Sequence, residues 1–258
     1  SDRQLQVRRI PRTTRTAPGS LSTGEPVSVR PVGSAIEVAG LTKRYDGRTV
    51  VDSISFEVRN GECFGILGPN GAGKTTTLEM VEGLRRPDGG TVSLLGTSPW
   101  PRDTSLLRRI GVQLQATAFI EHLTSIEQLR TVNDLYGVPA TRAEEVLEQV
   151  GLIDAADRDV DALSGGQRQR LSIACALVHR PEVLFLDEPS AGLDPGARRN
   201  LWDVVRTVRR DDTTVVLTTH HMDEAEQLCD RVPILDRGEI LALEHPAELV
   251  RQLDAPRR

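Results

Sequence analysis

Cysteine, lysine and long apolar runs are all scarce in this chain. Its three cysteines, Cys63, Cys175 and Cys229, lie far apart with no C-x-x-C pair, so neither a zinc site nor a disulfide framework is predicted. No apolar run reaches the roughly 18 residues that cross a bilayer, and the N-terminus has no signal-peptide core. The net charge of −5 disfavours a dedicated nucleic-acid-binding domain, which is usually basic. We therefore expect a soluble globular protein of a reducing cytoplasm, with no specific nucleic acid as partner.

The position of the rare lysines is informative. Only Lys43 and Lys74 are lysines among the 32 lysine and arginine residues. Lys74 lies in a segment that fits the phosphate-binding pattern G-x-x-x-x-G-K-[ST] at every fixed position. The segment and the hydroxyl residue after it are Gly68, Pro69, Asn70, Gly71, Ala72, Gly73, Lys74, Thr75 and Thr76. Because a compact ammonium group suits a crowded phosphate site better than a planar guanidinium, the sequence predicts a nucleoside triphosphate site.

The residues around this loop support the same interpretation. The apolar run at 63–67 predicts a buried strand, and residues 75–81 predict the start of a helix, which is the order that a phosphate-binding loop needs. Glycines let backbone N–H groups turn toward a phosphate, and a helix N-terminus adds about half a positive charge. Lys74 would then reach the β- and γ-phosphates, and the Thr75 hydroxyl would bind Mg²⁺.

The rest of the chain divides into tails and one domain. Residues 1–33 are rich in Arg, Thr, Ser, Pro and Gly without apolar periodicity, so we expect a disordered tail. Alternating apolar residues before the phosphate loop predict an antiparallel sheet, residues 106–177 are mostly helical, and later strands alternate with a helix as in a parallel α/β sheet. The segment 141–144, Thr-Arg-Ala-Glu, predicts a capping box. The expected α/β domain covers 34–250, followed by a short tail at 251–258.

A second motif points to a family. Its sequence is LSGGQ, made of Leu163, Ser164, Gly165, Gly166 and Gln167. A serine and two glycines at a helix start present N–H groups and a hydroxyl to an anion. With the phosphate loop, this signature motif makes residues 36–250 resemble the nucleotide-binding domain of ATP-binding cassette (ABC) proteins. The resemblance implies a P-loop NTPase core with a parallel sheet, an N-terminal antiparallel β subdomain and an inserted helical signature subdomain.

The same resemblance implies a shared ATP site. In the family, the signature motif closes over the γ-phosphate of an ATP held by the phosphate loop of a second subunit. One chain therefore supplies two half-sites, and a partner ABC ATPase subunit, here expected to be a second copy, completes them. The cofactors implied are ATP and Mg²⁺.

Two acidic positions also match the family pattern. The apolar strand at 183–186 ends in Asp187 and Glu188, which resembles the Walker B strand. By that resemblance Asp187 would bind Mg²⁺, and Glu188 would polarise the attacking water as general base. Asp194, in the segment Ser-Ala-Gly-Leu-Asp, resembles the aspartate of the D-loop at the dimer interface. It precedes a proline, so it is also a candidate helix cap.

Three further positions are less sharply defined. His220 lies where the family places its switch histidine, which contacts the γ-phosphate, and the adjacent His221 is the alternative. Gln115 resembles the glutamine that senses Mg²⁺ and the γ-phosphate, but Gln113 lies on the same strand face, so spacing alone does not separate them. We favour Gln115, because the family glutamine ends the strand. Tyr45 resembles the aromatic that stacks on adenine, with a surface tyrosine as the alternative.

The resemblance also implies a task. Segments 135–139 and 218–232 look like ATPase subunits of bacterial drug and antibiotic exporters of the ABC-2 type. Such a subunit would hydrolyse ATP, lie on the cytoplasmic face of the cell membrane as a peripheral protein, and drive a separate integral-membrane permease that contacts the loop after Gln115. An importer ATPase would share every catalytic residue, so import stays open.

Two other classes fit the sequence less well. A soluble ABC ATPase that acts on DNA or ribosomes would carry a second cassette, or a coiled-coil or zinc insertion between Gln115 and Leu163, and the chain has neither. A catalytically inactive cassette would have lost Glu188 or His220, and both are present. The sequence therefore predicts an active ATPase.

Overall fold

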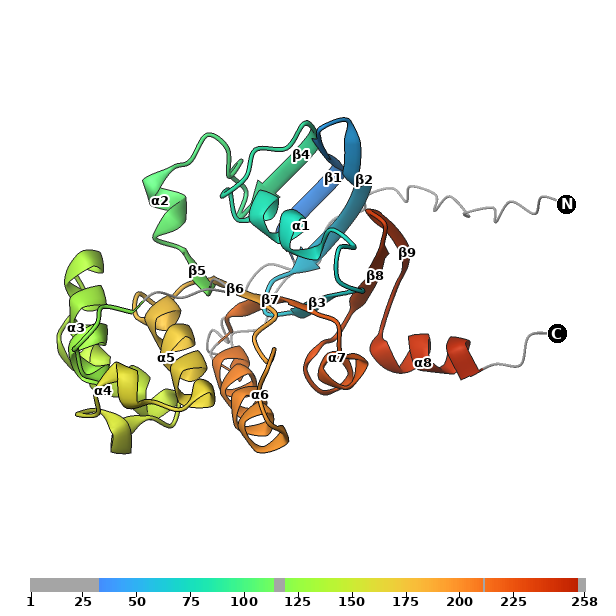
Figure 1. Ribbon diagram of the computed structural model, residues 1–258. Helices are drawn as coiled ribbons and strands as arrows, with labels where there is room; N and C mark the ends of the chain where they lie inside the picture. The colour runs from blue at the N-terminus through green and yellow to red at the C-terminus, as the bar shows by residue number, and fades with distance from the viewer. Residues whose placement is uncertain (1–32, 114–118, 211, 255–258) are drawn as a thin grey trace, which may run out of the picture. The chain divides into compact units, whose positions relative to one another are not determined.

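Two sheets organise the computed structural model, which describes residues 33–113, 119–210 and 212–254 (Figure 1). The smaller sheet is antiparallel in the order β2-β1-β4, with β1 (Ser34–Tyr45), β2 (Arg48–Arg59) and β4 (Gly89–Leu94). The larger sheet has the order β5-β6-β7-β3-β8-β9, and only β9 runs antiparallel to its neighbour. Its strands are β3 (Cys63–Leu67), β5 (Ile110–Gln113), β6 (Val183–Asp187), β7 (Thr214–Thr219), β8 (Val232–Asp236) and β9 (Glu239–Glu244).

Helices connect and cover these strands. The α-helices of the described ranges are α1 (Lys74–Val81), α2 (Thr104–Leu107), α3 (Ser125–Tyr136), α4 (Thr141–Gln149), α5 (Gly165–Leu177), α6 (Pro195–Arg210), α7 (Met222–Leu228) and α8 (Pro246–Asp254). Short 3₁₀ turns at Ile153–Ala155 and Val160–Ala162 lie between α4 and α5. No helix in these ranges has both the length and the apolar character of a membrane span.

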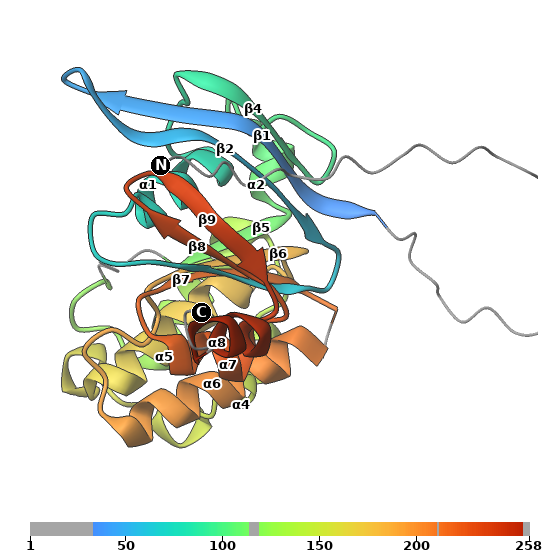
Figure 2. The same cartoon turned by 90° about the vertical axis from the view of Figure 1, so that its right-hand side faces the viewer.

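The larger sheet is covered on both faces. Figures 1 and 2 show α1 and the smaller sheet on one face, and α5, α6 and α7 on the other. The alternating side chains of β6 explain this arrangement, because Phe185 packs in the core beneath α1 while Leu184 packs against the helices of the opposite face. A parallel strand buried on both faces needs such a continuous apolar run. The α/β fold predicted from the sequence is confirmed.

One local feature differs from the sequence-based expectations. The predicted capping box at 141–144 is wrong: Ala140 is the N-cap of α4, no side chain caps that helix, and Glu144 instead accepts a hydrogen bond from Arg130 at 2.7 Å. Thr141 is already the first helical residue, so its hydroxyl is one position too late to cap. The predicted domain end at residue 250 falls inside α8. Of the predicted tail at 1–33, only Gly33 is described.

Candidate active site

The phosphate loop connects the end of β3 to the start of α1, as the sequence predicts. The residue before the helix, Gly73, has φ 104°, in the left-handed region that favours glycine. A Cβ at this position would lie 2.7 Å from the carbonyl oxygen of Val50, so the backbone of β2 also leaves no room for a side chain. Lys74 is then the first residue of α1 and is only 4% exposed. The loop thus passes close to β2, with the lysine at the helix N-terminus.

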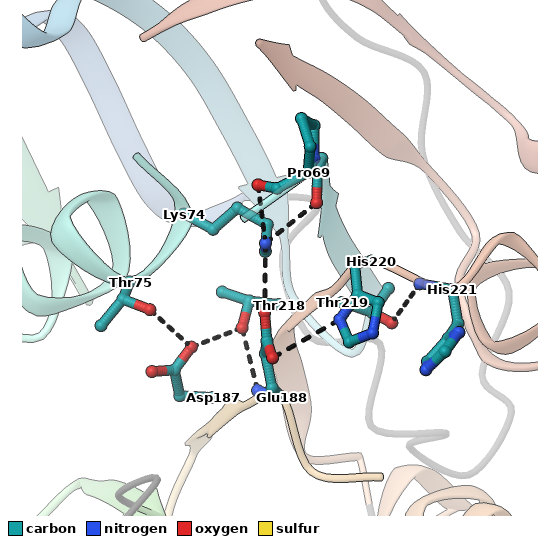
Figure 3. A network of polar contacts seen from close by, with 10 residues as sticks. Pro69, Lys74, Thr75, Asp187, Glu188, Thr218, Thr219, His220 and His221 are labelled. Atoms are coloured by element: carbon teal, nitrogen blue, oxygen red, sulfur yellow. Dashed lines mark hydrogen bonds and ion pairs between the residues drawn. The ribbon is translucent and has the colours of Figure 1, made fainter. Parts of the chain in front are cut away.

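The ammonium group of Lys74 lies at the centre of the site. Its Nζ donates to the carbonyl oxygens of Gly68 at 2.9 Å and Pro69 at 3.1 Å. It also forms an ion pair with Glu188 Oε1 at 3.1 Å (Figure 3). These contacts bring together the phosphate loop and the residue after β6, which are more than a hundred residues apart in the sequence.

A second cluster of oxygen atoms lies beside the lysine. The hydroxyl of Thr75 donates to Asp187 Oδ1 at 3.2 Å, and the hydroxyl of Thr218 donates to the same carboxylate oxygen. Thr218 also accepts a hydrogen bond at 2.9 Å from the backbone N–H of Glu188. The parallel pairing of β6 with β7 places Asp187 opposite Thr218 and so explains this contact. One threonine therefore fixes both acidic residues.

Glu188 has an unusual backbone conformation and a second partner. Its φ is 44°, in the left-handed region that a non-glycine residue rarely adopts and that often occurs at functional sites. Its Oε2 lies 3.4 Å from His220 Nδ1 (Figure 3). The ring of the other histidine, His221, is tilted by 41° against that of His220, with centroids 4.0 Å apart, and the backbone N–H of His221 donates to Thr219 Oγ1 at 3.0 Å. The side chain that faces Glu188 is therefore that of His220.

A cavity of about 330 Å³ opens beside Lys74, Thr75 and Glu188. Its walls are formed by the loop and its flanking residues: Asn70, Gly71, Gly73, Lys74, Thr75 and Thr76, with Val50 and Glu188. Backbone N–H groups, an ammonium group and a carboxylate thus line one polar hollow at a helix N-terminus. A glycine-rich loop with a lysine at a helix N-terminus is the arrangement that holds the phosphates of a nucleotide.

Comparison with known proteins identifies the family. Residues 51–191 match the profile described as ABC transporter. The chain is 44% identical over 219 residues to the Nod factor export ATP-binding protein I of Ralstonia nicotianae, which covers 83% of this chain and 68% of that protein. The chain belongs to the ABC transporter family. It is an ABC transporter ATPase, and ATP is the nucleotide that it binds.

Two more relatives support the assignment. The daunorubicin/doxorubicin resistance ATP-binding protein DrrA of Streptomyces peucetius is 44% identical over 223 residues, which is 85% of this chain and 68% of that protein. The solved structure of cbiO1 from Clostridium perfringens, described as part of the ABC transporter complex cbiONQ, has a TM-score of 0.79. It is 26% identical and covers 86% of this chain and 92% of its own.

The signature motif of this ABC ATPase lies apart from the phosphate loop. Ser164 is the N-cap of α5 and forms a capping box with Gln167, in which Gln167 N donates to Ser164 Oγ at 3.3 Å and Ser164 N donates to Gln167 Oε1 at 3.0 Å. Ser164 and Gly165 are exposed. Within the described ranges no hydrogen bond or ion pair joins the motif to the phosphate loop. The phosphate loop and the signature motif are therefore separate features within one chain.

Asp194 is a helix cap, as one of its two predicted roles requires. Its Oδ1 accepts hydrogen bonds from Gly196 N at 2.8 Å and Ala197 N at 3.0 Å in the first turn of α6. These bonds, from Ala197 first and then Gly196, hold the pKa of the Asp194 carboxyl below its usual range. The carboxylate is exposed and stays charged at neutral pH.

The predicted roles of two residues, Tyr45 and Gln115, stay predictions. Tyr45 ends β1 and is 36% exposed, with Arg85 Cζ 5.4 Å and Lys43 Nζ 5.6 Å from its ring centroid. Gln115 lies outside the described residues, whereas its alternative Gln113 ends β5 and is buried. The choice between the two glutamines stays a prediction.

Sequence reasoning missed one residue of the site and one buried acidic residue that is close enough to feel the charge of Asp187. The first is Thr218, whose role depends on strand register. The second is Glu82 at the C-cap of α1, which is 3% exposed and has one carboxyl oxygen without a hydrogen-bond partner among the described residues. Burial raises its pKa to about 8, and the charges of Asp187 and Glu79 add to this shift. Its position four residues after Leu78, on the apolar face of α1, was the available signal.

Proposed function

We propose that this chain is the ATP-hydrolysing subunit of a bacterial exporter, and that Glu188 is its general base. The observation that carries the catalytic part is the chain of contacts from Lys74 through Glu188 to His220. An ammonium group and a carboxylate from this chain of contacts line the cavity of about 330 Å³, and the imidazole contacts that carboxylate. The exporter part rests on the two relatives at 44% identity, which are named for Nod factor export and for daunorubicin/doxorubicin resistance.

Each residue of the site would have its own role in the hydrolysis step. Backbone N–H groups of the loop and the Lys74 ammonium would bind the β- and γ-phosphates and stabilise the charge on the transferring phosphoryl group. Glu188 would accept a proton from a water molecule as that water attacks the γ-phosphorus and the bond to the β–γ bridging oxygen breaks. His220, held by Glu188, would orient the water and contact the γ-phosphate. The products are ADP and inorganic phosphate.

The acidic end of β6 fits Mg²⁺. Thr75, which lines the cavity, has its Oγ1 3.2 Å from Asp187 Oδ1, and both are hard oxygen donors. Mg²⁺ is usually held by one or two such protein groups together with phosphate oxygens and water. When bound, the ion would neutralise charge on the phosphates. Gln115 is proposed as a further ligand on resemblance alone.

The second half of the site is proposed to come from a partner. Ser164, Gly165, Gly166 and Gln167 present an exposed helix start that resembles the γ-phosphate clamp of the family, and Asp194 lies at a neighbouring helix start. Closure of two copies would place this surface over the ATP of the opposite chain. ATP-driven closure would then pull on a separate permease on the cytoplasmic side of the membrane, and hydrolysis would release it.

Mixing two inactive variants tests the shared site. Lys74→Ala removes the phosphate-binding lysine, and Ser164→Arg blocks the signature helix start. Each should hydrolyse ATP at least about a hundredfold more slowly than wild type when alone. A mixed dimer has one complete site, so mixing should recover a substantial part of the activity. No recovery between two folded variants would contradict the shared arrangement.

The exporter assignment needs a test of its own. The chain should co-purify in mild detergent from native membranes with a multi-span permease, and vesicles containing both should accumulate the substrate in the direction of export when ATP is supplied on the side of this chain. Accumulation in the opposite direction would make the protein an importer subunit. Recovery with ribosomes or DNA-repair proteins alone would overturn the coupling to transport.

A further inference from the structure

The signature helix, α5, and the D-loop helix, α6, begin side by side in one chain. The N-terminus of α5 is closed by the capping box of Ser164 and Gln167, and the N-terminus of α6 is closed by Asp194. Both elements are anchored in the same apolar core, through Leu163 just before α5 and Leu201 within α6. Two capped, core-anchored helix ends therefore meet at the surface that the partner's ATP is proposed to contact.

Helices α5 and α6 approach each other closely at Gly166 and Ala197. A Cβ built on Gly166 would lie 2.8 Å from the Cβ of Ala197 and 3.7 Å from its Cα. Two carbon atoms that are not bonded do not pack at 2.8 Å, because their optimal separation is about 3.5 to 4.0 Å. Ala197 cannot turn away, since its only side-chain atom is fixed by the backbone and its N–H is bound to Asp194. A side chain at residue 166 would thus force α5 and α6 apart.

The neighbouring glycine of the same motif is different. A Cβ on Gly165 would have no atom of the chain within 4 Å among the described residues, and Gly165 is exposed. Neither glycine has a φ in the left-handed region. At residue 166 a side chain is therefore excluded by a contact within the chain itself. At residue 165 only a ligand or a partner chain could exclude one.

We propose that Ala197 is a positioning residue for ATP hydrolysis, because its contact with Gly166 fixes the signature helix against the D-loop helix. The two elements then approach the partner's nucleotide as one rigid unit. This inference rests on the proposed shared ATP site. It assigns to the second signature glycine a role in packing within one chain, in addition to any contact with phosphate.

A double-mutant cycle on the full chain tests this role. The four proteins are wild type, Gly166→Ala, Ala197→Gly and the double variant, measured for hydrolysis rate at saturating ATP, ATP affinity and thermal unfolding. A displacement of about 1 Å can cost on the order of a hundredfold in rate. We expect Gly166→Ala to lower kcat by about 10- to 100-fold, with ATP affinity within about twofold of wild type. The double variant should regain at least about tenfold over Gly166→Ala.

Gly165→Ala is the matched control. It adds the same methyl group one residue earlier, where no intrachain clash exists among the described residues, so Ala197→Gly should not improve it. If Gly166→Ala fails to fold, Ala197→Val enlarges the contact from the α6 side with both glycines intact and should lower kcat in the same way.

The outcomes separate this proposal from the proposed function. A double variant that stays as slow as Gly166→Ala would show that the glycine is needed only at the nucleotide, and would overturn the role of Ala197. If Gly166→Ala has a normal kcat and a lowered melting temperature, the contact between Gly166 and Ala197 contributes only to stability. That result would also overturn the positioning role of Ala197. Normal hydrolysis by both Gly166→Ala and Gly165→Ala would contradict the shared ATP site itself.

Discussion

Replacing Glu82 by Gln should stabilise the protein by an amount that grows with pH. Glu82 is 3% exposed, and burial, with the nearby charge of Asp187, raises its pKa from 4.5 to about 8. Between these values the folded protein keeps a proton that the unfolded chain releases, so the free energy of unfolding falls as pH rises. The amide introduced by Glu82→Gln would resemble the protonated acid and would not titrate.

The expected magnitude follows from the size of the shift. Each pH unit in this window is worth about 1.36 kcal/mol. At pH 7 the solution is about 2.5 pH units above the pKa of the unfolded chain, so protonation of Glu82 in the folded state lowers the free energy of unfolding of the wild type by about 3 kcal/mol. The amide removes this loss. Between about pH 5.5 and 7.0 the difference between variant and wild type should grow by about 2 kcal/mol. The slope is the test, because a misfit of the amide group would add only a constant.

Urea unfolding without nucleotide or Mg²⁺ measures this slope, since an added cation near Asp187 would stabilise the ionised form of Glu82. Glu148→Gln, which makes the same chemical change at an exposed carboxylate, is the control, and its effect on the free energy of unfolding should stay within about 0.5 kcal/mol. A stability difference at Glu82 that is the same at both pH values would refute the reasoning. It would mean that Glu82 is ionised in the folded protein.

Three other predictions concern the site. Thr218→Val keeps the side-chain shape but removes the hydroxyl that fixes both acidic residues, so kcat should fall about tenfold while KM for ATP stays within about threefold of wild type. Thr218→Ser should restore kcat. Loss of ATP binding by Thr218→Val would contradict this role. Tyr45→Ala should weaken ATP binding about three- to tenfold in a titration and Tyr45→Phe should not, so equal affinities would exclude stacking. Gln115→Ala should lower kcat about tenfold or more without changing the melting temperature. Gln113→Ala should mainly lower the melting temperature, because Gln113 is buried. The reverse result would exchange the two assignments.

Fixed spacings made much of the site predictable. A glycine-rich loop between a strand and a helix dictates where Lys74 lies, and an apolar strand that ends in two acids dictates where Asp187 emerges. These rules act over a few residues, so a sequence pattern captures them. The position of His220 beside Glu188 also agrees with the preference stated from the sequence, although the role of the residue is still a prediction.

The features that were missed depend on contacts between distant segments. Thr218 meets Asp187 because β6 and β7 pair in one register, which the sequence of either strand does not specify. The predicted capping box at 141–144 failed because a local pattern does not fix the first helical residue. The contact of Gly166 with Ala197 likewise joins two helices whose packing follows from the whole core.

The measurement that tests the central claim most directly is ATP hydrolysis by Glu188→Gln compared with wild type, with ATP binding measured on the same preparations. If Glu188 is the general base of this ABC ATPase, the variant should bind ATP at least as well as wild type and turn over at least about a hundredfold more slowly. Hydrolysis at near the wild-type rate would contradict the account, because the group that Lys74 and His220 both contact would then not be the base.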